Sequence, residues 1–137
     1  MARSLISRNW RVEDVAALER LACASNCGFP PPDLLPADCC VVEDGETVLG
    51  FGALYRVPGV SIATTDWIML EPHLSREDRA AVLGRLLDFF REVRQREGLA
   101  AVMVYSPFEE IREHLVARDL QEGEREMSRL SVRFRAA

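Results

Sequence analysis

The sequence contains no lysine. All 17 basic residues of the 137-residue chain are arginines, and 22 acidic residues give a net charge of −5. The absence of lysine excludes Schiff-base and pyridoxal-phosphate chemistry and also a Walker-type phosphate loop. Any phosphate that needs a cationic side chain must be bound by arginine, whose planar guanidinium suits that task. Biased codon usage is the alternative explanation for the missing lysine.

Long apolar runs are also missing. No stretch approaches the ~20 apolar residues of a membrane span, and the opening MARSLISR lacks the apolar segment of a signal peptide. We therefore expect a cytoplasmic protein without a membrane partner. The acidic charge disfavours nucleic acid as a partner. The composition is 48% hydrophobic and 28% charged, with no repeat or linker, so residues 1–137 are expected to form a single domain.

The four cysteines do not form a recognisable metal-binding pattern. Cys23 and Cys27 are one helical turn apart, which leaves a metal site as an alternative. Cys39 and Cys40 are adjacent, so in a strand they would point to opposite faces of the sheet. The paired Cys-x-x-Cys spacing of structural zinc sites is absent. We expect free, mostly buried thiols and no bound metal.

Hydrophobic patterning predicts alternating strands and helices. Strands are expected at 5–8, 39–43, 47–56, 60–70, 99–105 and 130–134, helices at 12–25, 75–97 and 108–119, and a proline-rich loop at 26–36. Asp44-Gly45 signals a two-residue hairpin, and Pro58-Gly59 marks a second turn. Three strands joined by tight turns make an antiparallel meander. The strand–helix–strand passage that follows requires one right-handed parallel crossover. The fold class is therefore α/β with a mixed sheet.

The ends of the last two helices carry their own signals. Ser75 begins a capping box, with Asp78 as the acid at the third helical position, and Gly98 is a suitable C-cap. The run between residues 99 and 105 is almost entirely apolar and suits a buried central strand. Ser106 followed by Pro107 is typical of a helix start.

Four segments resemble one family. Residues 6–14 are similar to its first strand and acidic helix start, 41–52 to its hairpin, 67–72 to its fourth strand with a terminal proline, and 115–120 to a late segment. The family is the GCN5-related N-acetyltransferase (GNAT) superfamily, and the resemblance covers nearly the whole chain. Short phage-encoded and bacterial proteins with a similar Trp-Ile-x-x-x-Pro strand belong to the same group. The resemblance implies a GNAT-like fold and acetyl-CoA as acyl donor.

The resemblance also implies a place for the pyrophosphate of coenzyme A. GNAT enzymes carry Arg/Gln-x-x-Gly-x-Gly/Ala at the start of the long helix, where backbone N–H groups bind the anion. Two registers are open here: 79–84, with Val82 in place of the first glycine, and 76–81, with Arg79 in that place. The residues implicated in cofactor binding are Arg76, Arg79, Ala80, Ala81 and Gly84.

Two features depart from the family pattern. Glu77 and Asp78 put negative charge where the pyrophosphate would bind, which Arg76 and Arg79 would have to offset. Leu115 stands where many GNAT enzymes have a tyrosine that protonates the leaving thiolate.

The remaining site residues also come from the resemblance. In the family, the third strand of the meander supplies a backbone donor for the oxyanion and often a glutamate base. The pantetheine would contact Ile68, Met69 and Leu70, with Ser106 in the place of an asparagine often found after the next strand. The candidate catalytic groups are Asp66, Glu71 and His114. Each also has a structural interpretation: a solvated strand residue, a strand end and a helix-surface residue.

Two functions follow from these patterns. The first is an N-acyltransferase that moves an acetyl or other acyl group from coenzyme A to an unknown small-molecule or peptide amine. The loop at 29–36 would shape the acceptor pocket, and Asp33 and Asp38 would favour a cationic amine. The second is a GNAT-fold binding or regulatory protein without catalysis. A homodimer is expected only by analogy with the family.

Overall fold

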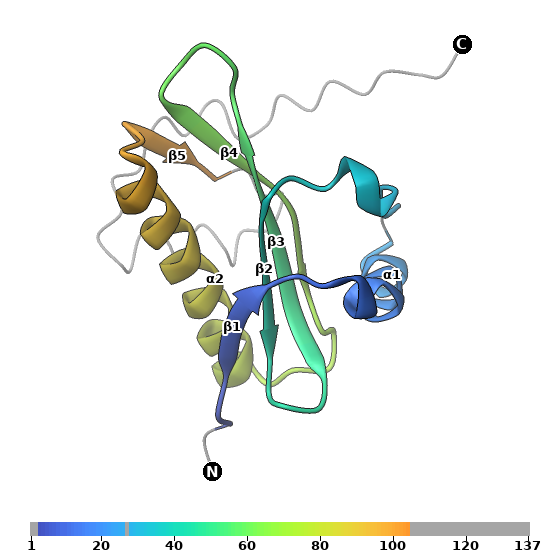
Figure 1. Ribbon diagram of the computed structural model, residues 1–137. Helices are drawn as coiled ribbons and strands as arrows, with labels where there is room; N and C mark the ends of the chain where they lie inside the picture. The colour runs from blue at the N-terminus through green and yellow to red at the C-terminus, as the bar shows by residue number, and fades with distance from the viewer. Residues whose placement is uncertain (1–2, 27, 105–137) are drawn as a thin grey trace. The chain divides into compact units, whose positions relative to one another are not determined.

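The computed structural model describes residues 3–26 and 28–104, all within one compact unit that ends at Val104. Its elements are β1 (Ile6–Asn9), η1 (Val12–Asp14), α1 (Val15–Ala24), η2 (Pro32–Leu34), β2 (Asp38–Glu43), β3 (Val48–Arg56), β4 (Ile62–Leu70), α2 (Arg76–Glu97) and β5 (Ala101–Met103). They form a five-stranded sheet in the order β1-β2-β3-β4-β5 (Figure 1). All pairs are antiparallel except the parallel pair β4–β5, so the predicted mixed α/β fold is confirmed. The helix predicted at 108–119 and the strand at 130–134 lie outside the described residues.

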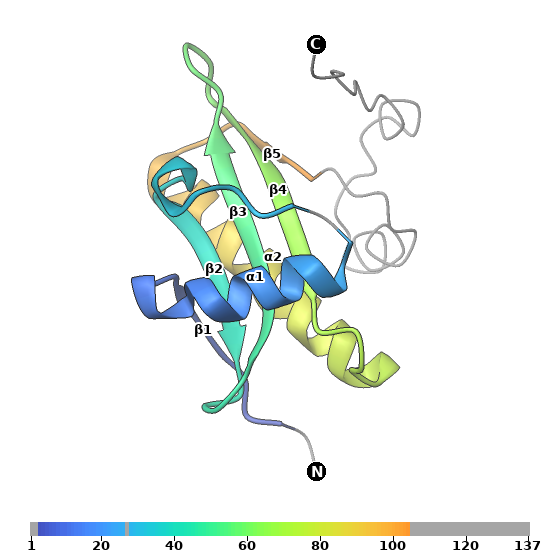
Figure 2. The same ribbon diagram turned by 90° about the vertical axis from the view of Figure 1, so that its right-hand side faces the viewer.

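The two helices cover opposite faces of the sheet, with α1 in front and α2 behind in Figure 2. Strand residues alternate between the faces, so each face has its own apolar layer. The α1 layer contains Leu18, Leu21, Cys39, Val41, Phe51, Ala53 and Met69. The α2 layer includes Val82, Leu86 and Phe90 of the helix.

Helix α2 packs closely on β3 because two glycines face it. A Cβ at Gly50 would overlap Cγ1 of Val82, and a Cβ at Gly52 would lie 2.7 Å from Cζ of Phe90. Neither position has room for a larger side chain, since the helix residues are themselves buried. The glycines therefore set the distance between the helix and the sheet.

The predicted helix ends of α2 are confirmed. Ser75 is the N-cap, and its hydroxyl oxygen accepts a hydrogen bond of 3.1 Å from the amide of Asp78. At the other end, Gly98 adopts a left-handed conformation with φ +63°, which glycine allows without steric cost.

Two local predictions need correction. The β2–β3 connection is a four-residue loop between Glu43 and Val48, in which Asp44 Oδ1 accepts hydrogen bonds from the amides of Glu46 and Thr47. The predicted two-residue turn is wrong because this side chain forms an Asx-type turn that closes a longer loop. Strand β5 is only half-buried over its described length, whereas its apolar sequence predicted a buried central strand.

Ion pairs connect the edge strand β1 to its neighbours. Arg8 of β1 donates hydrogen bonds of 2.8 Å to both Asp14 and Glu43, joining β1, η1 and β2. The hydrogen bond from Arg8 holds the pKa of Asp14 below its usual value, against the opposing effect of burial. Asp14 is only 6% exposed, so this pairing compensates a largely buried charge.

The described cysteines are free thiols, as predicted. Cys39 and Cys40 are fully buried, while Cys23 is exposed. Burial raises the pKa of both Cys39 and Cys40 to about 12, so these thiols stay protonated. Within the described residues, no group of three or more His, Cys, Asp or Glu side chains is arranged to hold a metal. Neither helix of that part of the chain combines the length and apolarity of a membrane span.

Candidate functional site

Within the described residues, β5 pairs with only the first part of β4, and we call the point where this pairing ends the fork. The two strands are paired only from Ile62 with Ala101 to Thr64 with Met103, while β4 continues to Leu70 beside β3. Over the second half of β4, the edge that faces away from β3 has no strand partner among the described residues. A peptide edge of this kind offers N–H and C=O groups to a ligand. The chain then enters α2 shortly after β4 ends, so the open edge leads toward the start of that helix (Figure 1).

A β-bulge interrupts β4 in this unpaired stretch. Phe51 pairs with Met69 and Ala53 pairs with Asp66, so Gly52 alone lies opposite two residues, Trp67 and Ile68. Trp67 has φ +56°, which is rare for a bulky residue. Its backbone amide donates a hydrogen bond of 2.7 Å to Oδ1 of Asp66. Bulges and left-handed non-glycine residues are concentrated next to functional sites.

Aromatic side chains surround the bulge on the α1 face. The ring of Phe29 meets Trp67 edge-on with a centroid distance of 6.5 Å and meets Phe51 at 5.9 Å. Burial raises the pKa of Tyr55. Trp67 and Tyr55 are partly buried against the core. Nothing in the residue pattern signalled the unusual backbone of Trp67.

The start of α2 offers backbone N–H groups beside charges of both signs. The first amides of a helix have no intrahelical acceptor, and the Ser75 hydroxyl satisfies that of Asp78. Glu77 and Asp78 both lie in this first turn, as expected. Arg3 lies 3.6 Å from the carboxylate of Asp78 and so partly offsets its charge. Arg3 was not among the predicted site residues because it is far from the helix along the chain.

The predicted pyrophosphate residues occupy different depths of α2. Arg76 is exposed at the first helical position, while Arg79 and Ala80 are half-buried in the next turn. Ala81 is exposed, and Gly84 is buried in the interior of the helix. The register 76–81 therefore spans the helix start, whereas 79–84 runs into a region where amides bond to carbonyls of the preceding turn.

The candidate catalytic carboxylates lie on either side of the bulge. Asp66 is exposed, and its pairing with Ala53 puts it on the α1 face. Glu71 directly follows β4 and forms an ion pair of 2.9 Å with Arg20 of α1. His114 and Ser106 lie outside the described residues.

The three predicted pantetheine contacts alternate along β4. Met69 belongs to the α1 layer. Leu70 lies on the α2 face, where its Cδ2 atom would be 3.4 Å from a Cβ placed on Gly50. Both side chains are nearly buried, while Ile68 in the bulge is half-buried. What these residues present at the open edge is therefore mainly backbone.

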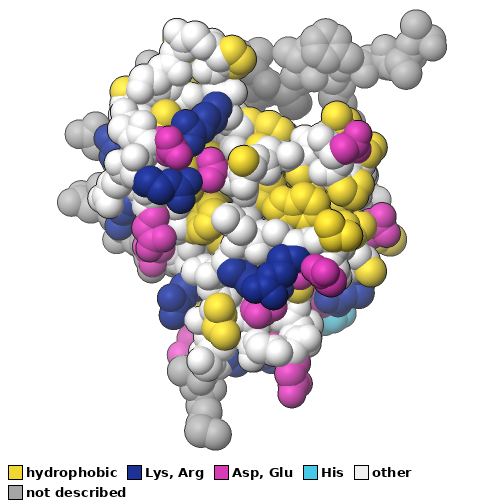
Figure 3. All heavy atoms as spheres, in the orientation of Figure 1, with side chains coloured by type: hydrophobic (Ala, Val, Ile, Leu, Met, Phe, Trp, Pro, Cys, Tyr) yellow, Lys and Arg dark blue, Asp and Glu magenta, His cyan; other side chains and the backbone are white. Residues whose placement is uncertain are grey.

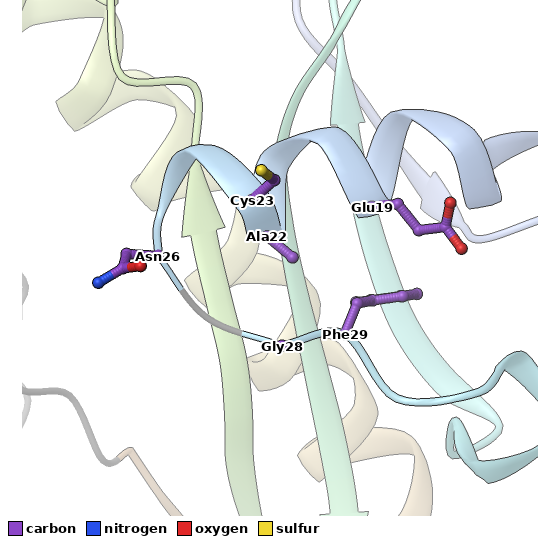
Figure 4. A pocket seen from close by; sticks show the side chains of 6 residues that line it. All are labelled: Glu19, Ala22, Cys23, Asn26, Gly28 and Phe29. Atoms are coloured by element: carbon purple, nitrogen blue, oxygen red, sulfur yellow. The ribbon is translucent and has the colours of Figure 1, made fainter.

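A shallow hollow of about 450 Å³ lies beside α1. Its lining residues are Glu19, Ala22, Cys23, Asn26, Gly28 and Phe29 (Figure 4). Phe29 links this hollow to the aromatic cluster at the bulge. Figure 3 shows an apolar area on the side of the molecule where α1 lies, with charged side chains of both signs over the rest of that face.

The two acids that were expected to attract an amine differ in their surroundings. Asp33 is exposed in η2. Asp38 is only 9% exposed and forms ion pairs with Arg56 at 3.4 Å and Arg96 at 3.0 Å. Its charge is therefore already compensated within the protein.

Comparisons with solved structures identify the fold. A mutant of the protein TTHA1254 from Thermus thermophilus matches with a TM-score of 0.74 and 19% identity, over 96% of this chain and 98% of that one. An acetyltransferase from Trypanosoma brucei matches with a TM-score of 0.67 and 16% identity, over 94% and 100%. N-acetylglutamate synthase from Neisseria gonorrhoeae, complexed with coenzyme A and N-acetyl-glutamate, matches with a TM-score of 0.61 and 12% identity. That match covers 86% of this chain and 28% of the synthase.

The chain thus has the GNAT fold, which confirms the resemblance inferred from the sequence at the level of the fold. No family model matches the chain, and no curated protein matches it in sequence.

Proposed function

We propose that this chain, which has the GNAT fold, is an N-acyltransferase that transfers an acetyl or other acyl group from coenzyme A to an amine. The observation that carries the proposal is the bulged edge of β4, which has no strand partner among the described residues beyond the fork and leads to the start of the 22-residue helix α2. An extended amide-containing arm can bond to such an edge as an added strand would. A pyrophosphate at the far end of that arm suits the N-terminus of a long helix.

In this arrangement the pantetheine lies along β4 from residue 66 to residue 70. The pyrophosphate binds at the 76–81 register, where the amides of Arg76 and Glu77 are in the first turn. Arg76 is exposed and can reach a bound phosphate, while Arg3 compensates Asp78. Charge-assisted hydrogen bonds from arginine to phosphate are the strong kind.

The chemistry requires little from the protein beyond orientation. The amine nitrogen attacks the thioester carbonyl, and the developing oxyanion accepts hydrogen bonds from a backbone donor on β4. The C–S bond then breaks, and coenzyme A leaves as the thiolate, which takes up a proton from water. The proton lost by the amine goes to a carboxylate, either Asp66 on this strand or Glu71 just after it, directly or through water. The acceptor approaches from the α1 side, where Phe29 and Trp67 form an aromatic wall.

A second candidate is a GNAT-fold binding protein without catalysis. The amide of Asp78 is already capped by Ser75, and two acids occupy the first turn of α2. These groups weaken an anion site at that position, since the helix dipole and the carboxylates act in opposite directions.

Acetyl-CoA binding is the first test. Calorimetry and thermal unfolding should both detect binding, with about 2.7 kcal/mol of added stability at a hundredfold excess over the dissociation constant. Arg76→Ala should weaken binding more than Arg79→Ala. Arg91→Ala, which removes an exposed arginine far along the same helix, is the matched control and should have no effect.

Turnover separates the two candidates. Release of the free coenzyme A thiol should be followed with a panel of small amines and peptide N-termini. Binding without release from any amine would favour the second candidate. The absence of binding to acetyl-CoA and to longer acyl-CoAs at millimolar concentration would refute the acyltransferase.

A further inference from the structure

Trp67 holds a backbone conformation that its own side chain disfavours. At φ +56° a bulky residue lies in the left-handed region, where Cβ crowds the neighbouring carbonyl oxygen. Such a conformation persists only where surrounding contacts over-determine it. The bulge at Trp67 and Ile68 is therefore a feature that other residues must maintain.

Two contacts, each from a different part of the chain, hold this residue. The carboxylate of Asp66 accepts a hydrogen bond of 2.7 Å from the Trp67 amide. Phe29, from the segment after α1, packs edge-on against the indole ring at 6.5 Å. The first of these acts on the backbone itself.

We infer that Asp66 is a positioning residue, whose carboxylate fixes the amide of Trp67 and thereby sets the bulge at the fork. This inference rests on the proposed acyltransferase function. The bulge places two residues opposite Gly52 and so changes the direction of the backbone groups along the open edge of β4, on which the acyl group would lie. Asp66 performs this task as a hydrogen-bond acceptor and does not need to take up a proton. The proton acceptor is then Glu71, directly after this strand.

The substitutions Asp66→Asn and Asp66→Ala distinguish a hydrogen-bond acceptor at this position from a catalytic base. Asparagine keeps a side-chain oxygen for the Trp67 amide but cannot take up a proton at neutral pH. Asp66→Asn should therefore retain kcat within about threefold, with an unchanged pH profile. Asp66→Ala should lower kcat at least about tenfold. Glu46→Ala, at the exposed β2–β3 loop, is the control for loss of a carboxylate and should match the parent.

The fluorescence of Trp67 gives a readout that does not depend on turnover. The chain has two tryptophans, so Trp10→Phe leaves Trp67 as the single emitter. In that background Asp66→Ala should shift the emission maximum, and Asp66→Asn should leave it unchanged.

The outcomes are distinct. Equal losses of kcat for Asp66→Asn and Asp66→Ala would overturn the positioning role and make Asp66 the base. An unchanged Trp67 emission in Asp66→Ala would also overturn it. If no acyl-CoA binds at all, the proposed function fails. The Trp67 emission of Asp66→Ala and Asp66→Asn then still decides whether Asp66 holds the bulge.

Discussion

The packing of α2 on β3 predicts a large effect for one added methyl group. In Gly52→Ala the new Cβ would lie 2.7 Å from Cζ of Phe90, well inside the 3.5–4.0 Å of an ordinary carbon–carbon contact. Phe90 is only 2% exposed, so its ring cannot swing into solvent. Either the helix or the strand must move by about 1 Å. Overpacking of this kind costs about 1–3 kcal/mol.

Urea and thermal unfolding measure this cost. We expect a lower urea midpoint with little change in slope, and a thermal midpoint reduced by about 4 °C for each kcal/mol lost. Gly50→Ala, which overlaps Val82, should behave in the same way. The same shift displaces α2 from the fork, so acetyl-CoA binding should weaken with stability.

Gly28→Ala is the matched control. A Cβ there meets nothing within 4 Å, and the residue has no positive φ, so the change should be neutral or slightly stabilising. The reasoning fails if Gly52→Ala and Gly28→Ala unfold at the same urea concentration, because glycine would then not be required for close packing.

Three further predictions concern buried groups. The Thr65 hydroxyl is buried without a hydrogen-bond partner among the described residues, so Thr65→Val should raise the unfolding free energy by about 1 kcal/mol; a loss of stability in urea would contradict this. The pKa of Asp14 is lowered in the folded protein, so its stabilising effect is present above its unfolded pKa and is lost as the pH falls through the folded value. Unfolding free energies at pH 7 and pH 3 should therefore differ less in Arg8→Met than in the parent, and an equal difference would show that the ion pair does not contribute. With a pKa of about 12, Cys39 should resist maleimide at pH 8 until the protein unfolds, while exposed Cys23 reacts; peptide mapping would detect the opposite order.

Much of the fold followed from local patterns. The box at Ser75, the apolar stripe of α2 and the glycine at residue 98 predicted the helix and both its ends, because capping and amphipathicity depend on residues close in sequence. The β2–β3 loop was predicted too short, since an Asp-Gly pair suits more than one turn. The hydrogen bonds from the amides of Glu46 and Thr47 to Asp44 depend on the conformation of the whole loop.

The candidate site could be predicted only in part. Asp66 and Glu71 were identified by resemblance, but their surroundings depend on contacts that sequence spacing does not encode. Arg20 reaches Glu71 from a helix on another layer, and Arg3 reaches Asp78 from the start of the chain. The two pyrophosphate registers fit the sequence equally well. They differ only once the first residue of α2 is known.

The sequence by itself determined which kinds of chemistry are excluded. It also determined the order of the helices and strands. The absence of lysine leaves any phosphate recognition to arginine and the backbone, and hydrophobic periods of 3.6 and 2 specify the helices and strands. Only the tertiary structure decided that β4 carries a bulge at Trp67, in the stretch that has no second strand partner among the described residues. A bulge is a mismatch in register between two strands, so it exists only when both strands and the residues that hold them are in place.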